Sequence, residues 1–72
     1  MKNLDIAIAL GNRIKSLRKE LGVSQELFSL MIGMDRTYFA SVESGKRNIS
    51  INNIEKIAKG LGISLEELFK EM

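Results

Sequence analysis

Residues 25–44 constrain the fold of this chain more than any other stretch. Two short segments within it have apolar residues at helical spacing. Phe28 and Ile32 lie four residues apart in the first segment, and Phe39 and Val42 lie three apart in the second. The pattern predicts two short amphipathic helices, each with one face turned toward a common core.

Three consecutive residues form the predicted turn between these helices. Gly33 lacks a Cβ, so it can adopt the left-handed conformation that ends a helix at little cost. Met34 fills the turn, and Asp35 is a good N-cap for the second helix. Ser29 is small at a point where the two helices must approach closely. A tight glycine turn between two helices is typical of a helix-turn-helix.

Apolar periodicity predicts another helix before this unit, from about Leu4 to Leu21. Gly11 interrupts it at a cost of about 1 kcal/mol relative to alanine. This glycine marks either a close contact with another helix or a later start of the helix. The apolar stripe of this helix comprises Ile6, Leu10, Ile14, Leu17 and Leu21.

Serine residues mark the starts of the remaining helices. Ser24 caps the first helix of the central pair, Ser50 caps a fourth helix, and Ser64 caps a fifth, with Glu67 completing a capping box. The predicted buried stripe of the fourth helix comprises Ile51, Ile54, Ile57, Ala58 and Leu61. The sequence therefore predicts an all-α fold of five helices in a single domain over residues 1–72.

Composition excludes several kinds of chemistry. The chain has no cysteine and no histidine, so it lacks a disulfide framework, a thiol nucleophile and the commonest general base. Glu66 and Glu67 point apart on a helix, and Ser41 and Ser44 have no base beside them in the sequence. No apolar run reaches the roughly 18 residues of a membrane span, and the start does not read as a signal peptide. We predict a cytoplasmic, non-enzymatic protein without a cofactor, metal site, membrane segment or evident small-molecule ligand.

Charge is distributed unevenly along the chain. The formal net charge is +2, but residues 66–72 carry a net −2. Residues 1–65 therefore carry +4, from ten basic and six acidic side chains. A basic excess away from the C-terminus favours a nucleic-acid partner.

Nearly the whole chain resembles the helix-turn-helix domain of the Cro and phage-repressor family. The similarity runs from RIKSLRKELGVSQ at residues 13–25, through the central pair, to IEKIAKGLGISLEELF at residues 54–69. Within that family, the chain is similar to the small controller proteins of restriction–modification systems. Three segments carry this similarity: DRTY from residue 35, VESGKRNIS from residue 42 and NIEKIAK from residue 53. The resemblance implies a compact, lambda-repressor-like five-helix bundle and a dimeric regulator of its own operon.

The second helix of the central pair has polar or small residues on its outward face. An α-helix fits the DNA major groove and reads base edges mainly from its N-terminal residues. Arg36 can pair with guanine O6 and N7, and the Thr37 methyl group can contact a thymine methyl group. Ala40 and Ser41 are short and let the helix lie deep. We predict that these four residues read the bases of a double-stranded DNA operator.

A second group of residues is predicted to contact the DNA backbone. The resemblance implies a phosphate contact for Gln25, and the helix start where it lies favours an anion. Tyr38 lies at the edge of the reading face and can bond a phosphate or a base. The loop after this helix is basic and could fix the register of binding, or it could simply be a solvated loop. The predicted backbone contacts are Gln25, Tyr38, Ser44, Lys46, Arg47 and Asn48.

Arg18 and Glu43 resemble the buried ion pair of the family. Arg18 follows the apolar residue Leu17, and Glu43 follows the apolar residue Val42. The resemblance implies a structural role, in which the pair fixes the angle of the reading helix.

Apolar residues near the C-terminus exceed what one small core needs. Leu68 lies at the centre of the stripe and is predicted to be buried. Ile63, Leu65, Phe69 and Met72 are then left over, and we predict that they form a two-fold homodimer interface. The alternative is that Leu65 and Phe69 pack on the first helix of their own chain.

The sequence therefore predicts a transcriptional regulator that binds a pseudo-palindromic operator as a homodimer, in the manner of a restriction–modification controller. A phage-type repressor would share the same chemistry. An antitoxin-like interaction module is the other alternative. Its partner would contact Leu27, Leu30 and Met31, which occupy positions that are usually polar in the family.

Overall fold

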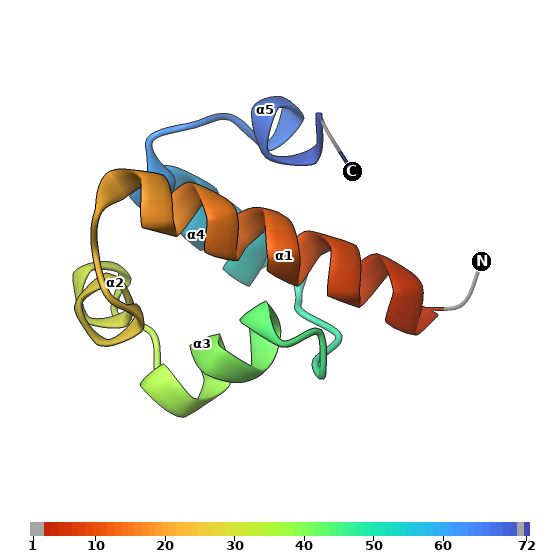
Figure 1. The fold of residues 1–72 in the computed structure, drawn as a ribbon, viewed down its shortest axis with the longest axis horizontal. Coiled ribbons are helices and arrows are strands. Elements are labelled where there is room, and N and C mark those ends of the chain that lie inside the picture. Colours follow the sequence, from red (N-terminus) through yellow and green to blue (C-terminus); the bar gives the residue numbers. More distant parts are fainter. Residues whose placement is uncertain (1–2, 71) are drawn as a thin grey trace.

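Five helices account for most of the computed structural model, which describes residues 3–70 and 72 (Figure 1). They are α1 (Asn3–Leu21), α2 (Gln25–Ile32), α3 (Arg36–Glu43), α4 (Ile51–Leu61) and α5 (Leu65–Phe69). The all-α prediction is confirmed, and no strand occurs in this part of the chain. None of the helices within it has the length and hydrophobicity needed to cross a membrane.

Local capping decides where the last four helices begin. The side chains of Ser24, Asp35, Ser50 and Ser64 each accept a hydrogen bond from the backbone N–H three residues later. This satisfies one of the N–H groups that an α-helix leaves without an intrahelical partner. Gly33 ends α2 with φ of 67°, as the predicted turn requires.

The long helix α1 supports three of the other four helices. It packs on α3, α4 and α5, while α2 packs on α3 and α4. In Figure 1, α5 lies above the crossing of α1 and α4, and α3 lies below it. The helix-turn-helix formed by α2 and α3 is therefore carried by α1 and α4.

The core is centred on two phenylalanine rings from the helix-turn-helix. The Phe28 and Phe39 ring centroids lie 5.2 Å apart with the ring planes tilted by 40°, and both side chains are fully buried. Burying one such side chain stabilises the fold by about 1.5–3 kcal/mol. Around them are Leu10, Ile14, Val42, Ile54, Ile57, Ala58, Leu61 and Leu68.

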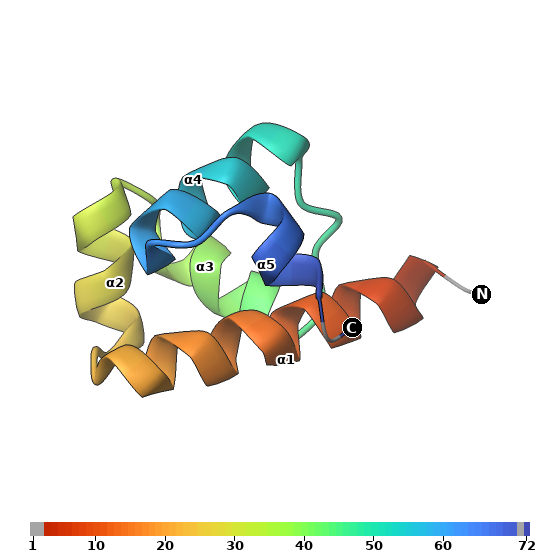
Figure 2. The ribbon, with the colours of Figure 1, turned by 90° about the horizontal axis from the view of Figure 1, so that it is seen from above.

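The predicted apolar stripes are partly wrong at the helix ends. The sequence predicts that Ile51 lies in the core, but this residue is 63% exposed. It is the first residue of α4, and side chains tilt toward the N-terminus of a helix, which carries Ile51 away from the core. Ile6 and Leu21 are also about half exposed, because they lie near the two ends of α1. In Figure 2 the N-terminal end of α1 extends beyond the other helices.

Two glycines allow α1 to approach the C-terminal end of α3 closely. A Cβ added to Gly11 would lie 2.5 Å from the carbonyl oxygens of Val42 and Glu43. Gly45 has φ of 78°, and a Cβ there would lie 2.6 Å from Ile8 Cγ1. Gly11 lies inside α1, so this glycine marks a close helix contact and not a later start of the helix.

Replacing Gly11 by alanine is expected to destabilise the fold. The added methyl group must push α1 away from α3, and forcing extra volume into a packed site typically costs about 1–3 kcal/mol. This cost should outweigh the gain of about 1 kcal/mol in helix propensity. Chemical unfolding monitored by circular dichroism measures the difference, with the exposed neighbour substitution Asn12→Ala as control. A Gly11→Ala protein more stable than the wild type would show that the helices are not in close contact.

Candidate nucleic-acid interface

The outward face of α3 begins with two exposed side chains. Arg36 and Thr37 form its first turn, and both are exposed. The opposite face of the helix is buried through Phe39 and Val42. Ala40 follows on the outward side and is partly exposed. All four predicted base-reading residues, Ser41 included, are exposed or partly exposed.

The Ser41 hydroxyl makes internal hydrogen bonds. Its Oγ donates to the Tyr38 carbonyl oxygen at 2.6 Å and accepts from Arg47 Nε at 3.1 Å. The proton of this hydroxyl is therefore used within the protein. Ser44 Oγ makes a similar local bond, because it donates to the Ser41 carbonyl oxygen at 3.0 Å. In this structure Ser41 connects α3 to the following loop.

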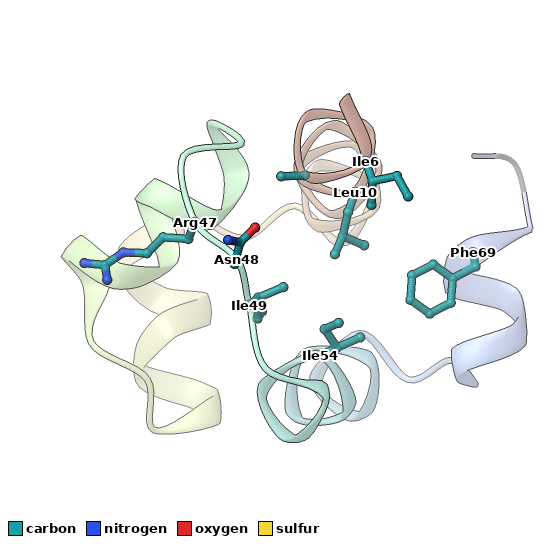
Figure 3. Close-up of a pocket in the computed structure, with 8 residues that line it drawn as sticks. Ile6, Leu10, Arg47, Asn48, Ile49, Ile54 and Phe69 are labelled. Carbon is teal, nitrogen blue, oxygen red and sulfur yellow. The ribbon is translucent and has the colours of Figure 1, made fainter. Parts of the chain in front are cut away.

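Arg47 leans from the loop over α3. Its guanidinium carbon lies 5.2 Å from the centre of the Tyr38 ring, and Figure 3 shows the side chain extended from the loop toward α3. A cation over an aromatic face contributes about 0.5–1 kcal/mol at an exposed site. Lys46 and Asn48, the other two predicted loop contacts, are exposed on either side of Arg47. The loop thus presents its basic groups beside the outward face of α3.

A buried ion pair joins α1 to the end of α3. Arg18 Nε donates to Glu43 Oε2 at 2.6 Å, and Arg18 Nη2 donates to Glu43 Oε1 at 3.1 Å. Both residues are less than 10% exposed. Arg18 Nη1 also donates to the Val23 carbonyl oxygen at 2.8 Å. Parallel bonds between a guanidinium and a carboxylate are strong and directional, so this pair restricts how α3 can tilt.

Gln25 extends this network to the start of α2. Its Nε2 donates to Glu43 Oε1 at 2.8 Å, and the side chain is partly buried. A glutamine amide has two N–H donors. One is used on Glu43, so the second can still be offered to a ligand at the α2 N-terminus.

Tyr38 is held at its hydroxyl by α4, which the sequence did not indicate. Asn53 Nδ2 donates to the Tyr38 hydroxyl at 3.2 Å, and both residues are partly buried. The two residues are 15 positions apart and lie on different helices. No local sequence pattern marks a pair of this kind.

Arg13 is a second residue that sequence reasoning missed. Its Nε donates to the Leu68 carbonyl oxygen at 3.1 Å, and its Nη2 donates to the Glu67 carbonyl oxygen at 3.0 Å. The Glu67 carbonyl oxygen also accepts a hydrogen bond from the Lys70 backbone N–H, and a cation beside the last carbonyl groups of a helix interacts favourably with the helix dipole. Arg13 therefore ties the short α5 to α1.

The four apolar residues of the predicted dimer interface differ in how far the fold buries them. Ile63 and Leu65 are partly buried against the core, whereas Phe69 and Met72 are 39% and 46% exposed. The Phe69 ring borders an open groove of about 300 Å³ between α1, α4, α5 and the loop before α4 (Figure 3). Its walls include Ile6, Leu10, Ile49 and Ile54.

The outer face of α2 is apolar and exposed. Leu27, Leu30 and Met31 are 46%, 77% and 54% exposed. These are the three residues at which the sequence departs from the polar character usual for this helix.

Known proteins resemble this chain over nearly its full length. A family model described as helix-turn-helix matches residues 14–68. The control protein C.MunI from Mycoplasma sp is 55% identical over 69 residues, which cover 94% of this chain and 93% of the relative. The crystal structure of the restriction–modification controller C.AhdI from Aeromonas hydrophila is 39% identical with a TM-score of 0.90, and covers 96% of this chain and 100% of that one. The controller C.Esp1396I was solved as a tetramer with its natural 35-base-pair operator. It is 33% identical with a TM-score of 0.84, and the match covers 97% of this chain and 90% of that one.

Breaking the buried ion pair is expected to cost more than removing both of its charges. Arg18→Ala or Glu43→Ala leaves one charge buried without its partner, and each should lower the free energy of unfolding by about 3–5 kcal/mol. The double substitution Arg18→Met with Glu43→Leu should be milder. Chemical unfolding of the three variants measures this, with Lys19→Ala as an exposed control that removes the same charge. Additive losses would show that the pair does not act as a unit.

Proposed function

The chain belongs to the helix-turn-helix family and, within it, to the controller proteins of restriction–modification systems, and we propose that it regulates transcription by binding a double-stranded DNA operator. The observation that carries this proposal is the contrast between the two ends of α3. Its first turn exposes Arg36 and Thr37, while Glu43 at its other end is locked in the buried ion pair. A helix held in this way presents its N-terminal side chains to a major groove.

Direct base reading is assigned to the first turn of α3. The Arg36 guanidinium can make two hydrogen bonds to guanine O6 and N7, which discriminate against other bases by about 1–3 kcal/mol. Thr37 can contact a thymine methyl group, and Ala40 allows close approach one turn later. Ser41 is short and is proposed to let the helix lie deep in the groove beside Ala40, while its hydroxyl also holds Arg47 through the bond from Arg47 Nε.

Backbone contacts on both sides of α3 would fix the register. Gln25 has a second amide N–H for a phosphate at the start of α2. Lys46 and Arg47 add positive charge along the loop, and such contacts contribute affinity without reading sequence. The proposed backbone set is Gln25, Tyr38, Ser44, Lys46, Arg47 and Asn48.

A symmetric homodimer would place two copies of α3 on one operator. The exposed Phe69 and Met72 supply apolar surface for this interface, and the partly buried Ile63 and Leu65 are proposed to add the part of their side chains that the core leaves accessible. A two-fold interface buries the same patch on both chains. Recognition helices about 34 Å apart would then match half-sites one DNA turn apart. The related C.Esp1396I was solved on its operator as a tetramer.

The regulator is proposed to act in the cytoplasm on its own operon, by binding and not by catalysis. The exposed apolar face of α2 favours a second candidate function, an interaction module that contacts a partner protein through Leu27, Leu30 and Met31. The two candidates differ in whether the chain binds DNA specifically.

Arg36→Ala should leave the fold intact and weaken specific binding by about 1–3 kcal/mol, with relaxed preference at one base pair in each half-site. Lys46→Ala should instead weaken binding to all sequences and reduce its salt dependence. Titrations against a duplex from upstream of the gene, with single base-pair variants, measure both effects. Equal weakening of every duplex by Arg36→Ala would make Arg36 a phosphate contact. Wild-type protein without preference for this duplex would favour the interaction module.

Phe69→Lys should convert a homodimer into a folded monomer, because it places a charge in the proposed apolar interface while Leu68 remains buried. Sedimentation equilibrium and circular dichroism measure assembly and folding separately. The control is Phe69→Leu, which keeps an apolar side chain and should remain dimeric. Operator binding by the monomer should be much weaker, because only one half-site contact remains. A wild-type protein that stays monomeric at tens of micromolar would refute the proposed dimer.

A further inference from the structure

Tyr38 is restrained at four points by other parts of the chain. Its hydroxyl accepts from Asn53 Nδ2 at 3.2 Å, its ring lies under the Arg47 guanidinium at 5.2 Å, and its carbonyl oxygen accepts from Ser41 Oγ at 2.6 Å. Its backbone N–H also donates to Asp35 Oδ2 at 2.9 Å. The side chain lies at the edge of the reading face of α3, and these contacts define its position there.

The bond from Asn53 determines whether the Tyr38 hydroxyl is a donor or an acceptor toward α4. A side-chain amide nitrogen can only donate, so the hydroxyl oxygen must be the acceptor in this bond. The proton of the hydroxyl is then available for another partner. That partner must itself be an acceptor, such as a phosphate oxygen, guanine O6 or N7, or thymine O4.

Asn53 is well placed to impose this hydrogen-bond direction on Tyr38. It is the third residue of α4, and its backbone N–H donates to the Ser50 hydroxyl of the helix cap at 3.2 Å. The cap therefore fixes the backbone from which the amide reaches Tyr38. Its neighbour Asn52 has the same side chain in the same helical turn but is exposed.

We propose that Asn53 is a positioning residue for operator recognition. From α4, it holds the Tyr38 hydroxyl so that the phenolic proton is directed at an acceptor atom of the DNA. This inference rests on the proposed function, because it assigns to Tyr38 a directed contact with the operator. Asn53 acts through Tyr38 and needs no DNA contact of its own.

The sharpest test exchanges the amide for a carboxylate. Asn53→Asp has nearly the same shape, but its oxygens only accept, so the Tyr38 hydroxyl would donate to Asp and lose its proton for the DNA. Asn52→Asp adds the same charge one residue away and serves as the control for repulsion by phosphates. We expect Asn53→Asp to weaken binding to the upstream duplex about tenfold more than Asn52→Asp does.

A second arm separates positioning from a purely structural role. In a Tyr38→Phe background the hydroxyl is absent, so Asn53→Asp should weaken binding no more than Asn52→Asp does. Melting temperatures of all variants, measured in parallel, show whether any substitution lowers the stability of the fold. A loss of stability alone would lower binding equally with or without the tyrosine hydroxyl.

Two results would overturn the inference while the proposed function stands. One is equal binding by Asn53→Asp and Asn52→Asp when the wild type binds the upstream duplex specifically. The other is an Asn53→Asp loss that persists in full in the Tyr38→Phe background. Wild-type protein that shows no preference for the upstream duplex over a shuffled one would overturn the proposed function and this inference together.

Discussion

The ion pair between Arg18 and Glu43 is the interaction on which the arrangement of α3 depends. It connects α1 to the last residue of α3, and Gln25 adds a third side chain from the start of α2. Charges with little solvent access are stabilised only by each other and by their hydrogen bonds, so the loss of one partner is costly. Three helices are thereby held in one orientation at a single buried point.

Close backbone contact reinforces the same end of α3. Gly11 lets α1 approach the carbonyl oxygens of Val42 and Glu43, and Gly45 lets the chain leave α3 beside Ile8. The C-terminal end of α3 is therefore closely packed against α1, while its first turn is exposed. This contrast between a packed C-terminal end and an exposed first turn suits a helix whose N-terminal residues enter a groove. Precise placement of those residues requires a fixed support.

The C-terminal region shows where sequence reasoning overestimated exposed apolar surface. The sequence predicts four residues in an interface, and the structure packs two of them, Ile63 and Leu65, partly against the core of their own chain. Apolar periodicity identifies a hydrophobic face and does not say which element covers it. The exposure of Ile51 has the same explanation. This residue continues the apolar stripe of α4, but at the first position of the helix no other element of the described chain covers it.

The sequence by itself determined the helices, their caps and the turn at Gly33, because these depend on interactions within a few residues. A resemblance of motifs also identified the Arg18–Glu43 pair, which periodicity alone would not have found. Only the tertiary structure decided the contacts of Asn53 with Tyr38 and of Arg13 with the carbonyl groups of α5. Those partners are 15 and about 55 positions apart, and their meeting depends on the angle and register at which helices pack. Interhelical geometry is a property of the whole core, so it decides side-chain partners that no local pattern specifies.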